Sequence, residues 1–174
     1  VLMLTAAVTL FHFANAAMLP LVGQYLSIGK SSGASLYMSA CIIVAQLVMI
    51  PVAIWAGRLA DLWGRRPVFL IGFAVLPLRG VAYALSDHPA WLIGVQVLDG
   101  IGAGIFGVLV VLMVSDLTRG TGRFNVTQGA IATAVSLGAA ISNLSAGFVV
   151  DAVGYAATFC VLAAIAVAAL APVG

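Results

Sequence analysis

The sequence is short of charge. Only 7% of its 174 residues are charged, glutamate is absent, and Lys30 is the single lysine. Soluble domains carry about 25% charged residues, so this chain has too few polar side chains to cover a water-soluble body. A nucleic-acid partner is excluded as well, because it requires clustered basic residues. The exterior must therefore be solvated largely by a lipid bilayer.

Motifs for cofactors and catalysis are also missing. The two cysteines, Cys41 and Cys160, fall in separate apolar runs, so they predict neither a disulfide framework nor a metal site. No phosphate-binding loop indicates an ATP-driven pump. No close pair of carboxylates or histidines indicates catalysis. We expect no metal, no cofactor and no enzymatic activity.

What the chain has in abundance is hydrophobic residues, at 64% with a mean hydropathy of +1.23. A membrane-spanning helix needs about 20 apolar residues, and six such runs follow one another. They predict a single all-α membrane domain over residues 1–174. Because both ends lie inside apolar runs, we expect a piece of a longer protein. The predicted spans cover about residues 1–26, 34–56, 68–85, 90–114, 128–150 and 155–174.

The basic residues predict an orientation. Alternate predicted loops hold all the arginines outside the spans, whereas the opposite loops hold only Lys30. Loops rich in Lys and Arg stay in the cytoplasm. The arginine loops and both ends of the fragment are therefore expected there. These arginines are Arg58, Arg65, Arg66, Arg119 and Arg123.

Small residues predict close helix packing. Gly100 and Gly104 stand four apart in the fourth span, a spacing that brings helices together in membranes. A ladder of small residues follows one face of the fifth span, at Ala130, Ala134, Gly138, Ser142 and Ala146.

The stretch GRLADLWGRRP at residues 57–67 resembles the signature loop of the major facilitator superfamily, roughly G-x-L-a-D-r-x-G-r-r. It falls between the second and third spans, as in that family, although Leu62 stands where a basic residue is usual. The resemblance implies half of a twelve-helix transporter with a solute cavity between its halves. The matching residues are Gly57, Leu59, Ala60, Asp61, Gly64, Arg65 and Arg66.

The resemblance also implies a role for this loop. Asp61 would join an ion network with Arg119 and Arg123 that latches the cytoplasmic side closed. Alternatively, the arginines of the loop only anchor the topology. Gln96 stands where the first half of the family often has Arg, and the fifth span lacks proline. Both departures favour the C-terminal half.

Two charges lie well inside predicted spans, Arg79 and Asp99. Charges at such depth are costly and are candidates for function. Adjacent antiparallel spans place the two at similar depth, which predicts an ion pair. Alternatively, Asp99 is a carboxylate that binds a proton or a cation.

Other polar residues form stripes along the predicted helices. His12, which can change charge near neutral pH, is a candidate for proton relay, for packing or for solute contact. In the family that the motif resembles, the first, second, fourth and fifth spans of a half line the cavity. The residues thus predicted for the solute site are His12, Asn15, Gln46, Gln96, Asp99 and Asn143.

Together these features predict a secondary active transporter of a small solute that works by alternating access, with proton-coupled export as one form. Its expected partners are the solute, protons, the bilayer and a second six-helix half, in a bacterial cytoplasmic membrane. The alternatives are a self-contained six-span channel and a half-size transporter that associates with itself.

Overall fold

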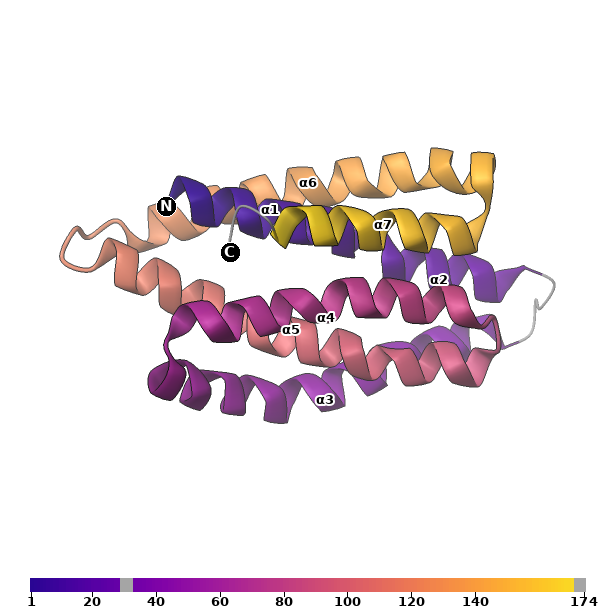
Figure 1. Cartoon of the computed structure of the whole chain (residues 1–174), viewed down its shortest axis with the longest axis horizontal. Coiled ribbons are helices and arrows are strands. Elements are labelled where there is room, and N and C mark those ends of the chain that lie inside the picture. Colours follow the sequence, from indigo (N-terminus) through magenta and orange to yellow (C-terminus); the bar gives the residue numbers. More distant parts are fainter. Residues whose placement is uncertain (29–32, 171–174) are drawn as a thin grey trace.

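A computed structural model describes residues 1–28 and 33–170 of the protein. Within these ranges the chain is almost entirely helical, which confirms the all-α prediction (Figure 1). Lys30 and the last residues of the sixth predicted span lie outside the described residues. The helices are α1 (Leu2–Ala16), α2 (Met18–Ser27), α3 (Ala34–Trp63), α4 (Arg65–Leu85), α5 (Pro89–Thr118), α6 (Phe124–Val153) and α7 (Tyr155–Leu170).

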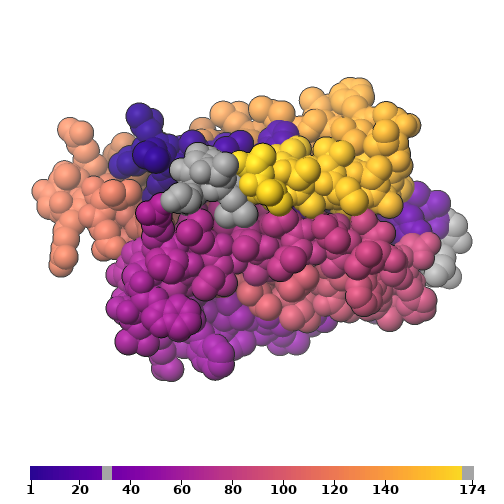
Figure 2. Space-filling view, in the orientation of Figure 1, coloured from indigo at the N-terminus to yellow at the C-terminus, as the bar shows by residue number. Residues whose placement is uncertain are grey.

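The helices run up and down in one elongated bundle, so that the turns gather at two ends. The arginine end holds Gly64 and residues 119–123, and the Asp87 end holds residues 86–88 and Gly154. Helix α3 packs mainly on α5, α4 packs on α5 and α7, and α1 packs on α6 and α7. Figure 2 shows α7 lying along α4. Residues from all seven helices therefore contribute to one continuous core.

Five helical segments are long and apolar enough to cross a membrane, with α1 and α2 counted as one segment. The shorter apolar helix Tyr155–Ala169 follows them in the described part of the chain. Helices α3, α5 and α6 have 30 residues each. At 1.5 Å per residue they exceed the hydrocarbon thickness of about 30 Å. Their ends therefore reach the headgroup region.

This length corrects the prediction of a charged loop at residues 57–67. Helix α3 continues to Trp63 and α4 begins at Arg65, so only Gly64 lies between them. Its φ of 89° is a left-handed conformation that glycine adopts without steric cost. The second charged loop, predicted between the fourth and fifth spans at residues 115–127, is shorter too, at residues 119–123. Hydropathy marks where the hydrocarbon ends, whereas a helix continues wherever headgroups and water solvate its charges.

The first predicted span is two helices that meet at Ala17, three residues before Pro20. Proline lacks an N–H group, and its ring clashes with the carbonyl four residues earlier. For Pro20 that carbonyl belongs to Ala16, the last residue of α1. The break therefore falls one turn before the proline that causes it. Pro51 and Pro77 lie inside α3 and α4 without interrupting them.

Aromatic side chains fill the centre of the core between α1, α4 and α5. Phe11 and Phe106 stack with ring centroids 3.7 Å apart. Phe73 meets Phe11 edge to face at 5.2 Å, and Phe69 lies 4.9 Å from Phe106. Such pairs contribute about 0.5–1.5 kcal/mol each beyond the area they bury. They fix α1 against the α4–α5 pair.

Small residues allow neighbouring helices to approach closely at the positions that the sequence predicted. A Cβ atom on Gly100 would lie 2.5 Å from the Ala45 carbonyl oxygen of α3, and one on Gly104 would lie 2.9 Å from that of Met49. On α6, a Cβ on Gly138 would lie 3.0 Å from a methyl carbon of Thr9. Of the five-residue ladder on α6, three members are buried: Gly138, Ser142 and Ala146.

Candidate functional site

A buried ion pair joins α4 to α5. Arg79 keeps only 2% of its surface exposed, and its Nη1 contacts Oδ1 of Asp99. Its Nη2 donates to the backbone carbonyl of Asn15, 3.4 Å away. That carbonyl lies next to the break between α1 and α2. One guanidinium thus links three segments at the depth where α1 ends.

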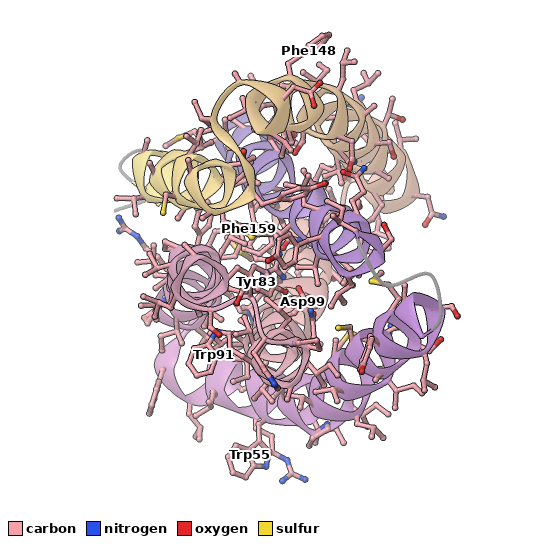
Figure 3. The ribbon with its side chains drawn as sticks, turned by 90° about the vertical axis from the view of Figure 1, so that its right-hand side faces the viewer. Trp55, Tyr83, Trp91, Asp99, Phe148 and Phe159 are labelled. Carbon is pink, nitrogen blue, oxygen red and sulfur yellow. The ribbon has the colours of Figure 1, made fainter. Side chains whose placement is uncertain are left out.

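The aromatic ring of Tyr83 extends this polar cluster. The Arg79 Cζ atom lies 5.7 Å from the ring centroid of Tyr83. The Tyr83 hydroxyl accepts a hydrogen bond of 2.8 Å from Nε2 of Gln96. Gln96 has no exposed surface, so the structure places it between helices rather than on a cavity wall. Figure 3 shows Tyr83 and Asp99 inside the bundle.

Beside this cluster lies an open pocket of about 310 Å³ between α1, α5 and α6. His12 and Asn15 line it from α1, Gly107 from α5, and Gln128 and Ala132 from α6. The His12 imidazole packs edge-on against Phe106 at 5.7 Å. Aromatic and small apolar walls with a few polar groups are typical of sites for small molecules.

Asp99 lies behind this pocket. A cavity of about 10 Å³, lined by Arg79 and Asp99, shares Phe11, Asn15 and Ala103 with the larger pocket. That volume is close to the space one water molecule needs. The side chain of Asp99 is 18% exposed, against 3% for that of Arg79. The carboxylate is therefore the more accessible member of the pair.

The other predicted site residues lie elsewhere. Gln46 is exposed on α3, and Asn143 is exposed on α6 with its Nδ2 donating to the Ala139 carbonyl of its own helix at 2.8 Å. Neither lines the pocket that holds His12 and Asn15. Gln128, which does line it, was missed because the sequence places it at the boundary between a charged loop and a span.

At the arginine end, Arg65 connects three helices. Its Nη1 lies 2.6 Å from Oδ1 of Asp61 on α3, and its Nε lies 3.1 Å from Oδ2 of Asp116 on α5. The predicted partners Arg119 and Arg123 take no part in this network, although both are exposed nearby. Asp116 was missed, although it is the one acidic residue of the second charged loop.

The remaining residues of the signature motif surround this network. Arg58 is exposed on α3, and Arg66 is exposed on α4 beside Arg65. Gly57 lies inside α3, where an added Cβ would make only an ordinary contact of 3.9 Å. The tight turn therefore depends on Gly64 alone. Side-chain exposure of 73% for Asp61 and 52% for Asp116 limits each ion pair to roughly 0–1 kcal/mol.

A family model, described as Major Facilitator Superfamily, matches residues 1–173. The chain belongs to the major facilitator superfamily. It is thus an integral membrane protein of a transporter family rather than an enzyme, and the resemblance carried by residues 57–66 is confirmed.

Curated relatives of this superfamily member are longer proteins. It is 58% identical over 161 residues to an uncharacterized MFS-type transporter of Mycobacterium tuberculosis, covering 92% of this chain and 38% of that relative. It is 37% identical over 103 residues to a cephamycin export protein of Amycolatopsis lactamdurans, covering 58% and 21% respectively. The chain thus spans less than half the length of these relatives.

A solved structure shows the same arrangement of helices. The inward-open xylose transporter XylE of E. coli matches with a TM-score of 0.77 at 17% identity, covering 99% of this chain and 46% of that one. At this identity the likeness concerns the fold. It confirms that the described helices have the architecture of half of a transporter from this superfamily.

Proposed function

We propose that the chain is the C-terminal half of a secondary active transporter that carries a small solute by alternating access. The observation that supports this most is the open pocket on α1, α5 and α6. The buried ion pair of Arg79 and Asp99 lies next to this pocket. A second six-helix half would close over this pocket. The two halves would rock around a site near the middle of the membrane.

Export is the proposed direction, because the Amycolatopsis relative is named as an export protein. By the positive-inside rule, the arginine end faces the cytoplasm and the Asp87 end faces outward. The pocket combines aromatic rings, the His12 imidazole and the amides of Asn15 and Gln128. Such walls fit a small organic solute with an apolar body and a few hydrogen-bonding groups.

Asp99 is the proposed coupling group. A proton bound to its carboxylate would neutralise it and release Arg79 from the ion pair. Arg79 would still hold the Asn15 carbonyl at the α1–α2 break, so a change of charge at Asp99 would act on the helix that bears His12. His12 is the second candidate, since it lines the pocket itself.

The network of Asp61, Arg65 and Asp116 is proposed to stabilise the state closed to the cytoplasm. Its exposed ion pairs contribute about 1 kcal/mol at most, which corresponds to roughly a fivefold change in a conformational equilibrium. Arg65 bridges α3, α4 and α5, so the loss of either carboxylate would loosen the same three helix ends. The network therefore adjusts the equilibrium without being required for transport.

Flux measurements test this function. The full-length protein would be reconstituted in proteoliposomes and supplied with a radiolabelled cephamycin, with and without an imposed pH gradient. We expect transport that depends on the gradient. Equal rates with and without the gradient would exclude proton coupling, and no transport under either condition would exclude this class of solute.

Variants of the arginine end extend the same assay. Asp61→Asn and Asp116→Asn are each expected to slow transport by roughly two- to fivefold, because each removes one exposed ion pair. Asp151→Asn, at an exposed carboxylate of the other end, is the matched control and should leave the rate unchanged. Unchanged rates in both arginine-end variants would count against the latch.

A further inference from the structure

A second cavity, of about 280 Å³, lies at the Asp87 end of the bundle. Its walls come from α2, α4, α5 and α7, whereas the central pocket is formed by α1, α5 and α6. The two share no lining residue. Five of the side chains around it carry aromatic rings or charge: Tyr25, Tyr83, Asp87, Tyr155 and Phe159.

Two pairs of aromatic rings form part of the walls of this cavity. Tyr25 and Tyr155 meet edge to face, with centroids 5.2 Å apart and an angle of 68° between their planes. Tyr83 and Phe159 lie 5.0 Å apart at 41°. Figure 3, viewed from this end, shows Phe159 on α7 facing Tyr83 on α4. Four rings from three helices thus line one small space.

A carboxylate lies at the rim of the same space. Oδ2 of Asp87 accepts a hydrogen bond of 3.0 Å from the Tyr25 hydroxyl, which holds the carboxylate beside the aromatic walls. In the described part of the chain, no basic side chain forms an ion pair with Asp87. Asp87 also lines an adjoining hollow of about 350 Å³ together with His88. The cavity is therefore open on the side of its negative charge.

We propose that this cavity binds a small organic cation, such as one bearing a quaternary ammonium group. Aromatic faces attract cations within about 6 Å of the ring centroid, and the Asp87 carboxylate supplies a full opposite charge. Val22 and Leu92, which also line the cavity, would contact the apolar substituents of the cation. A neutral molecule of the same shape would gain only the apolar contacts.

Among the residues that the structure describes, the basic side chain and the histidine nearest the cavity do not occupy it. Arg79 lies against the Tyr83 ring but is paired with Asp99 inside the bundle. His88 lines the adjoining hollow and not the cavity itself, and its Nδ1 atom accepts a hydrogen bond from the Ala90 amide at 3.3 Å. The site lies outside the central pocket and, by the proposed orientation, opens to the extracytoplasmic side.

The test compares choline with 3,3-dimethylbutan-1-ol, which has the same shape without the charge. Binding of radiolabelled choline to the purified full-length protein would be measured with the neutral alcohol as competitor. We expect saturable choline binding that the alcohol does not displace at tenfold excess. Equal competition by the alcohol, or no saturable binding, would overturn the proposal.

Variants locate the binding at this cavity. Asp87→Asn should weaken choline binding at least about tenfold, because the opposite charge is lost. Tyr155→Leu should weaken it several-fold, whereas Tyr155→Phe should retain it because the aromatic face remains. Asp151→Asn, which removes an exposed carboxylate outside the cavity, should bind as the parent protein does. Equal affinities for Asp87→Asn and Asp151→Asn would place the choline elsewhere and overturn the proposal.

Discussion

Asp99→Asn is expected to lower the stability of the protein by roughly 3–5 kcal/mol, the usual cost of removing one partner from a buried ion pair. The cost arises because Arg79, 2% exposed, would keep a buried charge with only neutral partners, namely the introduced amide, the Asn15 carbonyl and the Tyr83 ring. The loss would be read as a fall in thermal midpoint of the detergent-purified full-length protein, measured by fluorescence-detected size-exclusion chromatography.

A double variant distinguishes the contribution of the ion pair from the cost of leaving one buried charge unpaired. Because both charges are removed together, Arg79→Met with Asp99→Leu should melt closer to the parent protein than Asp99→Asn alone does. Asp151→Asn is the control, since its carboxylate is exposed at the end of α6 and should shift the midpoint little. A parent-like midpoint for Asp99→Asn would show that the pair is not buried as described.

Gly100→Ala is expected to lower the stability of the protein by roughly 1–3 kcal/mol, the usual cost of overpacking. This is the second largest loss of stability that we predict. Its new methyl group would lie 2.5 Å from the Ala45 carbonyl oxygen and 2.7 Å from Cβ of Val48. Backbone atoms cannot rotate away, so α3 and α5 would have to separate. The same thermal assay measures the effect.

Gly94→Ala is the matched control on the same helix. An added Cβ there meets nothing within 4 Å, and alanine favours a helix over glycine by about 1 kcal/mol in water. The midpoint of this variant should equal or exceed that of the parent. Similar midpoints for the two alanine variants would contradict the close contact of α3 and α5.

The fold could be predicted from the sequence because the hydrophobic runs have the length of a bilayer and few charges interrupt them. The helix ends could not, because residues 57–63 are charged yet still helical. Hydropathy reports the solvent around a segment and not the hydrogen bonds of its backbone. The break at Ala17 could not be predicted either, because the proline that causes it lies one turn later in the sequence.

Some residues of the candidate site could be placed from the sequence and others could not, for a geometric reason. Depth in the membrane can be counted along a sequence, which is why Arg79 and Asp99 were expected at the same level. The rotation of each helix about its own axis, which decides the side chains that face its neighbours, cannot be read from the sequence in this way. Gln96, predicted for the solute site, is therefore buried against Tyr83. Gln128, which was not predicted for the site, lines the pocket. Asp116 was missed because its partnership with Arg65 depends on how α4 and α5 pack.

The measurement that tests the central claim most directly is cysteine accessibility in the full-length protein with its native cysteines replaced. A cysteine at Ala132, which lines the open pocket, would be exposed to a membrane-impermeant thiol reagent from either side. Alternating access predicts modification from both sides, with a larger cytoplasmic share in Asp61→Asn. A cysteine at Ile71, 46% exposed on α4 and expected to face lipid, should react from neither. Modification of the Ala132 cysteine from one side alone, with and without a pH gradient, would contradict the account.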